Sequence, residues 1–128
     1  MALDPAAISE DNRADMKLAV FVLNREDLLP QVLEAYVEAG IGGATILDSE
    51  GMGRFLTHEV PLFADFKEFM KGTRPHNKTI LSVVRNEEAI QRLLALLDKV
   101  CGDLSRPGTG IFFTVPVEIC KGLGPTEG

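Results

Sequence analysis

The sequence predicts one small α+β domain in which the order strand, helix, strand occurs twice. The first observation behind this is that short apolar segments of strand length alternate with longer segments of helical periodicity. The second is size, because 128 residues, 45% of them hydrophobic, can bury one core but hardly two. Residues 1–16 have no steady hydrophobic period, so we expect a flexible arm or leader there and a single domain over 17–128.

The first half of the domain is expected to contain two strands and one helix. Residues 17–23 are apolar and rich in β-branched and aromatic side chains, which is typical of a buried central strand. Apolar residues then recur at helical spacing over 29–37, with Asp27 placed to cap the helix and Gly40 to end it. A second strand is predicted over 44–48.

The second half repeats this order. Residues 78–84 predict a strand, and the helix that follows begins with Asn86 as its capping residue. A glycine-rich turn at 106–110 leads into a last strand at 111–117. Pro116 places that strand at a sheet edge or a bulge, because proline cannot donate a ladder hydrogen bond.

This element order is that of the ferredoxin-like split βαβ fold (βαββαβ), a four-stranded antiparallel sheet with two helices on one face. The first strand is apolar on both sides, because Leu18 and Val20 alternate with Ala19 and Phe21. The face without helices must therefore be covered by something else. Self-association is the simplest cover, so we expect a homo-oligomer.

The connection between the second and third strands, about residues 51–77, is far longer than a hairpin requires. It contains an apolar stripe at helical spacing that predicts a short amphipathic helix: Leu62, Phe63, Phe66, Phe69 and Met70. We favour packing of this helix on its own domain or on a neighbouring subunit over a dedicated docking surface for a partner.

Composition argues against two broad classes of function. The net charge of −6 and the pI of about 4.9 give a surface that repels a phosphate backbone, so no nucleic-acid partner is expected. No apolar segment has the length of a membrane span, and residues 1–16 lack the features of a secretory signal. A cytoplasmic protein that is not embedded in a membrane is therefore predicted.

Motifs of enzyme chemistry are not found, so we predict no catalytic residue and no enzyme. His58 and His76 both fall in the long connection, where solvated loop residues are a better interpretation than metal ligands. Cys101 and Cys120 have no neighbouring Cys or His at metal-ligand spacing, so both are interpreted as reduced packing thiols. No metal site is predicted.

Several short segments resemble the PII family of signalling proteins. Thr45 and the run Gly51–Arg54 resemble the family's strand-to-loop junction, and residues 110–118 resemble its last strand. The connection 51–77 falls where that family has its T-loop, and the resemblance extends over 17–123. It implies a homotrimer that binds an adenine nucleotide between subunits, and a T-loop that engages a target such as a transporter or an enzyme.

The resemblance also implies roles for individual residues. Thr45 would meet the base, Arg54 would pair with the phosphates, and Lys121 would reach over from the neighbouring subunit. Independently of any family, two glycine-rich corners would expose backbone N–H groups that can hold an anion. The predicted ligand-binding residues are Thr45, Gly51, Gly53, Arg54, Gly108, Gly110 and Lys121. For each glycine taken alone, a tight turn remains the alternative explanation.

The expected ligand is ATP, ADP, AMP or a cyclic nucleotide, with no cofactor required. The chain departs from the family pattern at Phe55 and Gly110, where PII proteins carry Gln and Lys, so sensing of 2-oxoglutarate is not expected. The only tyrosine, Tyr36, lies on the first helix rather than in the T-loop. An alternative is a trimeric binder of divalent metal similar to CutA, without nucleotide sensing. Loop length and the glycine corners favour the first hypothesis.

Overall fold

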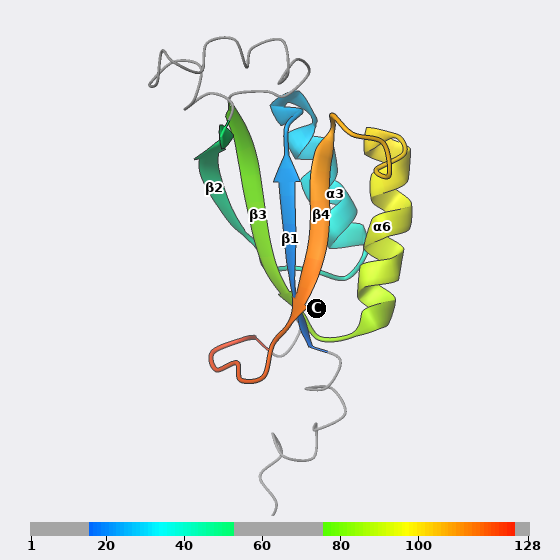
Figure 1. Ribbon diagram of the computed structural model, residues 1–128. Coiled ribbons are helices and arrows are strands. Elements are labelled where there is room, and N and C mark those ends of the chain that lie inside the picture. The colour runs from blue at the N-terminus through cyan, green and yellow to red at the C-terminus, as the bar shows by residue number, and fades with distance from the viewer. Residues whose placement is uncertain (1–15, 53–75, 125–128) are drawn as a thin grey trace, which may run out of the picture.

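The computed structural model describes residues 16–52 and 76–124, and all structural statements refer to these two ranges. The strands form one four-stranded antiparallel sheet in the order β2-β3-β1-β4 (Figure 1). This is the ferredoxin-like split βαβ fold that the sequence predicts. The elements are β1 (Lys17–Leu23), η1 (Glu26–Leu28), α3 (Leu29–Glu38), β2 (Thr45–Glu50), β3 (His76–Val84), α6 (Glu87–Cys101) and β4 (Gly110–Pro116).

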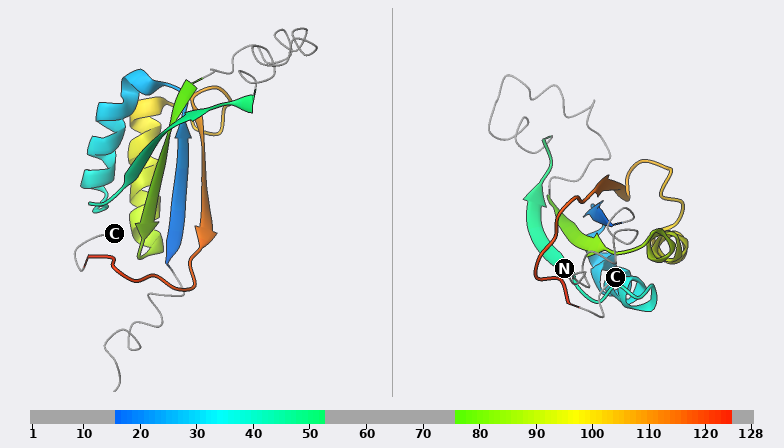
Figure 2. Two further views of the ribbon diagram at one scale, coloured as in Figure 1. Left: turned by 90° about the vertical axis from the view of Figure 1, so that its left-hand side faces the viewer. Right: turned by 90° about the horizontal axis from the view of Figure 1, so that it is seen from below.

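Both long helices pack on one face of the sheet (Figure 2). Phe21 at the centre of β1 pairs with Ile80 of β3 and Phe112 of β4, and all three side chains point toward the helices. Complete burial of a large apolar side chain contributes about 1.5–3 kcal/mol, so this layer is the main source of stability. The residues that are fully buried in it include Ala19, Phe21, Leu23, Val32, Ile80, Val84, Leu93 and Leu97.

The two helices begin in different ways. At α6 the prediction is confirmed, because the Asn86 side chain accepts a hydrogen bond from the Ala89 N–H at 2.8 Å. At α3 the predicted Asp27 cap is wrong: the 3₁₀ turn η1 comes first, and α3 starts after Leu28. The Asp27 carboxylate instead accepts two hydrogen bonds from the Arg25 guanidinium, a charge-assisted pair that outcompetes a single backbone N–H.

Strand boundaries differ from the predictions mainly at the long connection. β3 begins at His76, which pairs with Glu50 of β2, so His76 is a strand residue and its placement in the connection was wrong. An antiparallel ladder extends as far as both backbones stay paired, and side-chain pattern alone does not fix that point. His58 and the predicted helix around Phe66 lie outside the described residues. β4 is an edge strand, as Pro116 predicted, and it ends at Pro116, one residue before the predicted end.

After β4 the chain passes beneath the sheet toward the side of β2 (Figure 2). The Val117 N–H donates to the carbonyl of Met16, which is itself buried. The Arg85 guanidinium donates to the carbonyls of Leu123 and Gly124 at 3.4 and 2.5 Å. These bonds hold the C-terminal segment at the end of the sheet where β1 starts.

The second face of the sheet carries apolar side chains from all four strands but no helix of the described ranges. Cross-strand register places Val20 of β1 between Leu81 of β3 and Phe113 of β4 on this open face. Ile111 and Phe113 are 64% and 46% exposed. The prediction of strands that are apolar on both sides is therefore confirmed. No described helix is long and apolar enough to cross a membrane.

Candidate functional site

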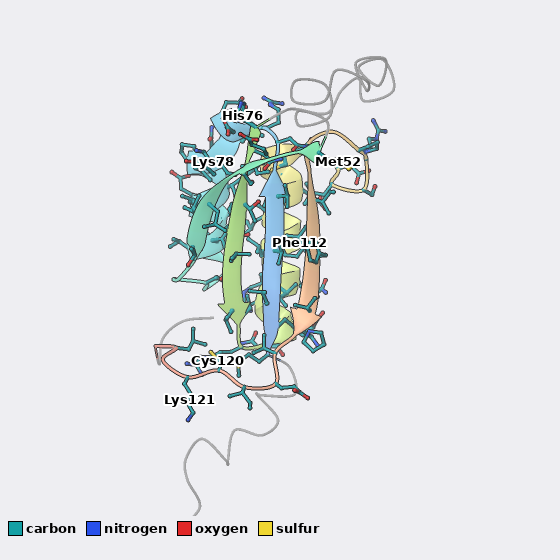
Figure 3. All side chains as sticks on the ribbon, turned by 60° about the vertical axis from the view of Figure 1, so that its left-hand side comes forward. Met52, His76, Lys78, Phe112, Cys120 and Lys121 are labelled. Carbon is teal, nitrogen blue, oxygen red and sulfur yellow. The ribbon has the colours of Figure 1, made fainter. Side chains whose placement is uncertain are left out.

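The predicted ligand residues that the structure describes lie in two groups at opposite ends of the sheet. Thr45 starts β2 and Gly51 follows its end, which separates them by about 20 Å at about 3.3 Å per strand residue. Figure 3 shows the two ends, with Met52 and His76 at the upper one and Cys120 and Lys121 at the lower one. Gly53 and Arg54 lie outside the described residues. Within one chain, therefore, the described residues do not form a single site.

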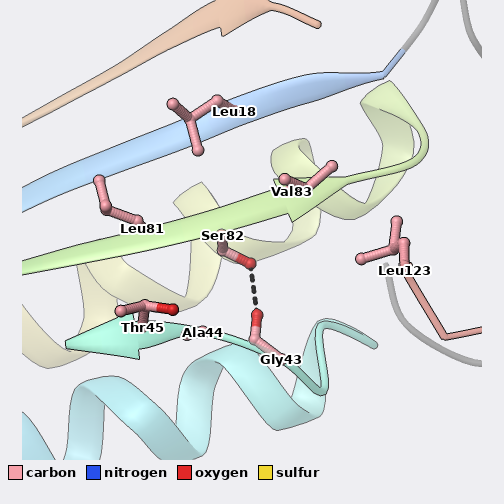
Figure 4. Close-up of a pocket in the computed structure, with 8 residues that line it drawn as sticks. All are labelled: Leu18, Gly43, Ala44, Thr45, Leu81, Ser82, Val83 and Leu123. Atoms are coloured by element: carbon pink, nitrogen blue, oxygen red, sulfur yellow. Dashed lines mark hydrogen bonds between the residues drawn. The ribbon is translucent and has the colours of Figure 1, made fainter. Parts of the chain in front are cut away.

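A cavity of about 310 Å³ lies around Thr45, on the open face of the sheet (Figure 4). Side chains of β1 and β3 form its floor, the start of β2 forms one wall, and Leu123 of the C-terminal segment contributes another. Its lining residues are Leu18, Gly43, Ala44, Thr45, Leu81, Ser82, Val83 and Leu123. We call this the Thr45 pocket.

The chemistry of the Thr45 pocket suits a flat, largely apolar group. None of its eight lining residues is charged, and Leu18, Leu81 and Val83 present aliphatic surface. The Ser82 hydroxyl is already used, because it donates to the Gly43 carbonyl at 2.7 Å. The Thr45 hydroxyl can donate and accept a hydrogen bond, so it is the group suited to read a polar edge of a bound molecule.

At the opposite end, the turn at 106–110 leads into β4. Gly108 has a φ of +118°, which side-chain-bearing residues rarely adopt. At Gly110 a Cβ would lie 2.4 Å from the Val22 carbonyl oxygen, so the close approach of β4 to β1 requires glycine. Backbone geometry thus explains both glycines without a ligand.

The two glycine corners of one chain also lie far apart. Gly51 follows β2 and Gly108 precedes β4, and these are the two edge strands of the sheet. Three strand spacings of about 4.8 Å give about 14 Å between them, too far for one phosphate to contact both. A site that uses both corners would need residues from more than one chain.

Three cations near this upper end are already paired with carboxylates. Lys78 of β3 forms an ion pair with Asp48 of β2, which lowers the pKa of Asp48 and raises the pKa of Lys78. Arg25 pairs with Asp27 at 2.7 Å, and Arg106 lies 4.0 Å from Asp103. A phosphate bound here would have to compete with these carboxylates for its cations.

Potential metal ligands and thiols do not gather in one place within the described residues. Ranges 16–52 and 76–124 contain no group of three or more His, Cys, Asp and Glu side chains that could hold a metal ion. Cys101 and Cys120 are free thiols. Burial raises the pKa of the Cys101 thiol, which disfavours the reactive thiolate.

Sequence reasoning missed most of the Thr45 pocket. Alternation along β3 predicts that Leu81 and Val83 share a face, which was a usable signal. No sequence pattern predicts that Leu123 lines the pocket, because its position depends on the return of the C-terminal segment beneath the sheet. Gly43 was not singled out either, although its carbonyl fixes the rim of the pocket through Ser82.

Comparison with known proteins supports the fold. No known family profile matches this chain, and no curated protein sequence matches it. Among solved structures it is similar to the PII protein of Arabidopsis thaliana, solved bound to citrate, with a TM-score of 0.54 and 18% sequence identity. The match covers 81% of this chain and 78% of the PII chain. At this identity the similarity shows that the chain has a PII-like fold.

Proposed function

We propose, on the premise of this PII-like fold, that the chain is a cytoplasmic regulatory protein and not an enzyme. It forms a homotrimer and binds an adenine nucleotide or a related small anion in clefts between subunits. It controls a protein target, such as a transporter or an enzyme, through the connection 51–77. The observation that carries this proposal is that the Thr45 pocket opens on the uncovered, apolar face of the sheet.

The exposed side chains of that face support self-association. Ile111, Phe113 and Val115 of β4 are all exposed and lie on the same side of one strand. Burying each against a neighbouring copy would contribute about 1.5–3 kcal/mol before the cost of association. Since Leu18 lines the pocket and also belongs to this face, the pocket would lie at a subunit boundary.

An adenine base fits the chemistry of the Thr45 pocket. The base is flat and has a polar edge, and the pocket offers aliphatic walls with the Thr45 hydroxyl among them. A volume of about 310 Å³ is at the small end of the range for ligand sites, which suits one ring system rather than a whole nucleotide. The phosphates would extend out of it toward Arg54, the glycine corners or Lys121, contributed in part by a neighbouring chain.

The test is a thermal-shift screen of the full chain against ATP, ADP, AMP, cyclic dinucleotides and divalent cations. A ligand that binds only the folded state raises the melting temperature, so we expect a rise with at least one adenine nucleotide. A rise with divalent cation alone would contradict nucleotide binding and favour the CutA-like alternative. No rise with any nucleotide would also contradict it.

Arg54→Ala tests the predicted phosphate contact. Loss of one charged hydrogen-bond partner is expected to weaken nucleotide affinity by about 1–3 kcal/mol in isothermal titration, with the trimer intact by light scattering. Lys99→Ala is the matched control, because it removes an exposed cation from the last turn of α6, which lies outside the proposed site. Equal affinities in wild type and Arg54→Ala would remove Arg54 from the site.

A further inference from the structure

A row of polar side chains crosses the upper end of the sheet, on the face that is otherwise apolar. Ser49 lies on β2, Asn77 and Thr79 on β3, and Asn24 directly after β1. Ser49 is hydrogen-bonded to both Thr79 and Asn77, and Asn77 is bonded to Asn24. Asn24 in turn is bonded to the turn before β4. We call these four residues the polar row.

The hydrogen bonds of the polar row run in one direction. The Ser49 hydroxyl has a single hydrogen, which it donates to the side-chain carbonyl of Asn77, so Thr79 must be the donor to Ser49 at 2.7 Å. The Asn77 amide then donates to the Asn24 side-chain carbonyl at 3.5 Å. The Asn24 amide donates to the Gly108 carbonyl at 3.1 Å. Each amide thus accepts on its oxygen and donates from its nitrogen.

The polar row runs between two parts of the molecule that the proposed function requires to be coupled: the stem of the connection and the glycine turn at 106–110. Ser49 and Asn77 form the second-to-last pair of the β2–β3 ladder, next to the Glu50–His76 pair that closes it before the connection. Asn24 holds the glycine turn twice, since its backbone N–H also donates to the Thr109 carbonyl at 2.8 Å. The polar row therefore joins the stem of the connection to a turn on the opposite edge.

Burial makes the members of the polar row depend on one another. Asn77 is only 6% exposed, so an amide group that lost a partner there would be left unsatisfied. Orientation of the Asn77 amide is set by Ser49 on one side and Asn24 on the other. A change at either end therefore shifts the preferred orientation of the whole row.

We propose that Ser49, Asn77 and Asn24 are positioning residues that couple the glycine turn at 106–110 to the stem of the connection. An anion bound at this turn alters the hydrogen bond from the Asn24 side chain to the Gly108 carbonyl. The polar row transmits that change to Ser49 and the end of β2. The role of the anion rests on the proposed function. The coupling itself is a property of the chain without ligand.

The first test is Ser49→Ala, followed by amide hydrogen exchange by NMR. It should accelerate exchange of the Asn24 N–H, which donates to Thr109, by about three- to tenfold, the factor that one hydrogen bond's net contribution gives. Ser82→Ala is the matched control, because it deletes an equivalent serine hydroxyl bond at the other end of the sheet. Equal exchange at Asn24 in the two variants would overturn the coupling.

Two further variants separate coupling from general loss of stability. Ser49→Thr keeps the hydroxyl and should restore wild-type exchange at Asn24. Asn24→Asp keeps the oxygen that accepts from Asn77 but loses the donor to Gly108. This variant perturbs the other end of the polar row, so the amide signals of Ser49 and Gly51 should change. An Asn24→Asp spectrum unchanged at Ser49 and Gly51 would also overturn the proposal.

ATP is the probe for the ligand step. In wild type, ATP should shift the amide signals of the glycine turn and of Ser49 to Met52 together, and in Ser49→Ala it should shift those of the turn alone. If ATP does not bind but Ser49→Ala still accelerates exchange at Asn24, the nucleotide function fails and the coupling stands. If ATP binds and leaves Ser49 to Met52 unshifted in wild type, the coupling fails and nucleotide binding stands.

Discussion

The two faces of the sheet are built from the same strands and yet have different partners. Toward the helices, Phe21 and Leu23 are completely buried within the chain. Toward the open face, Val22 is half-buried and Ile111, beside it on β4, is 64% exposed. The difference shows that one chain completes one apolar layer and leaves a second layer incomplete. The first layer is the main source of stability, and the second is the surface on which we propose assembly.

The Thr45 pocket adds a functional consequence to this difference. It opens on the incomplete layer, so its final shape depends on what covers that face. A ligand bound there would contact both the chain and its cover, which would link ligand affinity to assembly. Substitutions on the two faces should therefore have separable effects.

Phe21→Ala is expected to have the largest effect on stability. Removing a fully buried aromatic ring from a close-packed layer costs about 3–5 kcal/mol of the free energy of unfolding. Guanidinium denaturation followed by circular dichroism measures it. Val22→Ala, one residue along on the open face, is the comparison and should cost clearly less in dilute protein. Equal losses would mean that the two faces do not differ as described.

Phe113→Asp is expected to break assembly rather than folding. A carboxylate on the open face opposes burial against a second copy, so sedimentation should show a monomer with an unchanged circular dichroism spectrum. Thr114→Asp places the same charge on the next residue of β4, on the other side of the strand, and should leave the mass of the assembly unchanged. A trimer that persists in Phe113→Asp would exclude this face as the interface.

Tyr36, on the helix-covered side, should have the smallest and most specific effect, which is on the pH dependence of the free energy of unfolding. Its hydroxyl is buried with no hydrogen-bond partner in the described ranges, and burial raises the pKa of this phenol far above its usual value. The folded state keeps the proton while the unfolded state loses it above about pH 10. The free energy of unfolding should therefore be unaffected below pH 10 and should fall as pH rises above it.

Tyr36→Phe is the test of this pH dependence. It should abolish the contribution of Tyr36 to the loss above pH 10 and leave stability at pH 7 unchanged or slightly higher, since it removes an unsatisfied hydroxyl. Because the chain has one tyrosine, phenolate absorbance in wild type reports this group directly. Phenolate that appears in the folded protein near pH 10 would show that the hydroxyl is not buried as described.

Much of the fold could be predicted because its signals are local. The apolar stretch 17–23 and the Asn86 cap depend on residues within a few positions of each other, and both predictions are confirmed. The predicted helix cap at Asp27 was wrong because Arg25 binds the Asp27 carboxylate, and residue spacing does not reveal that competition. The placement of His76 in the connection was wrong because the end of a strand ladder depends on the partner strand. Here His76 pairs with Glu50 of β2.

The candidate site was less predictable than the fold because it depends on distant contacts. Turn chemistry correctly located Gly108, but nothing in its neighbourhood shows that Asn24, eighty-four positions away, holds its carbonyl. Leu123 enters the Thr45 pocket only because Arg85 holds the C-terminal segment in place. Whether the predicted phosphate contacts come together stays a prediction, since it requires residues of more than one chain.

The hydrogen bond from Val117 to Met16 has a practical consequence for studying this protein. It brings the start of β1 and the chain beyond β4 together at one end of the sheet, while Met52, His76 and the glycine turn lie at the other end. A tether to a sensor surface, or a fluorescent reporter fused near either of these two segments, would face away from the end where regulation is proposed. Immobilised protein can therefore be presented to candidate targets with the Met52 end outward.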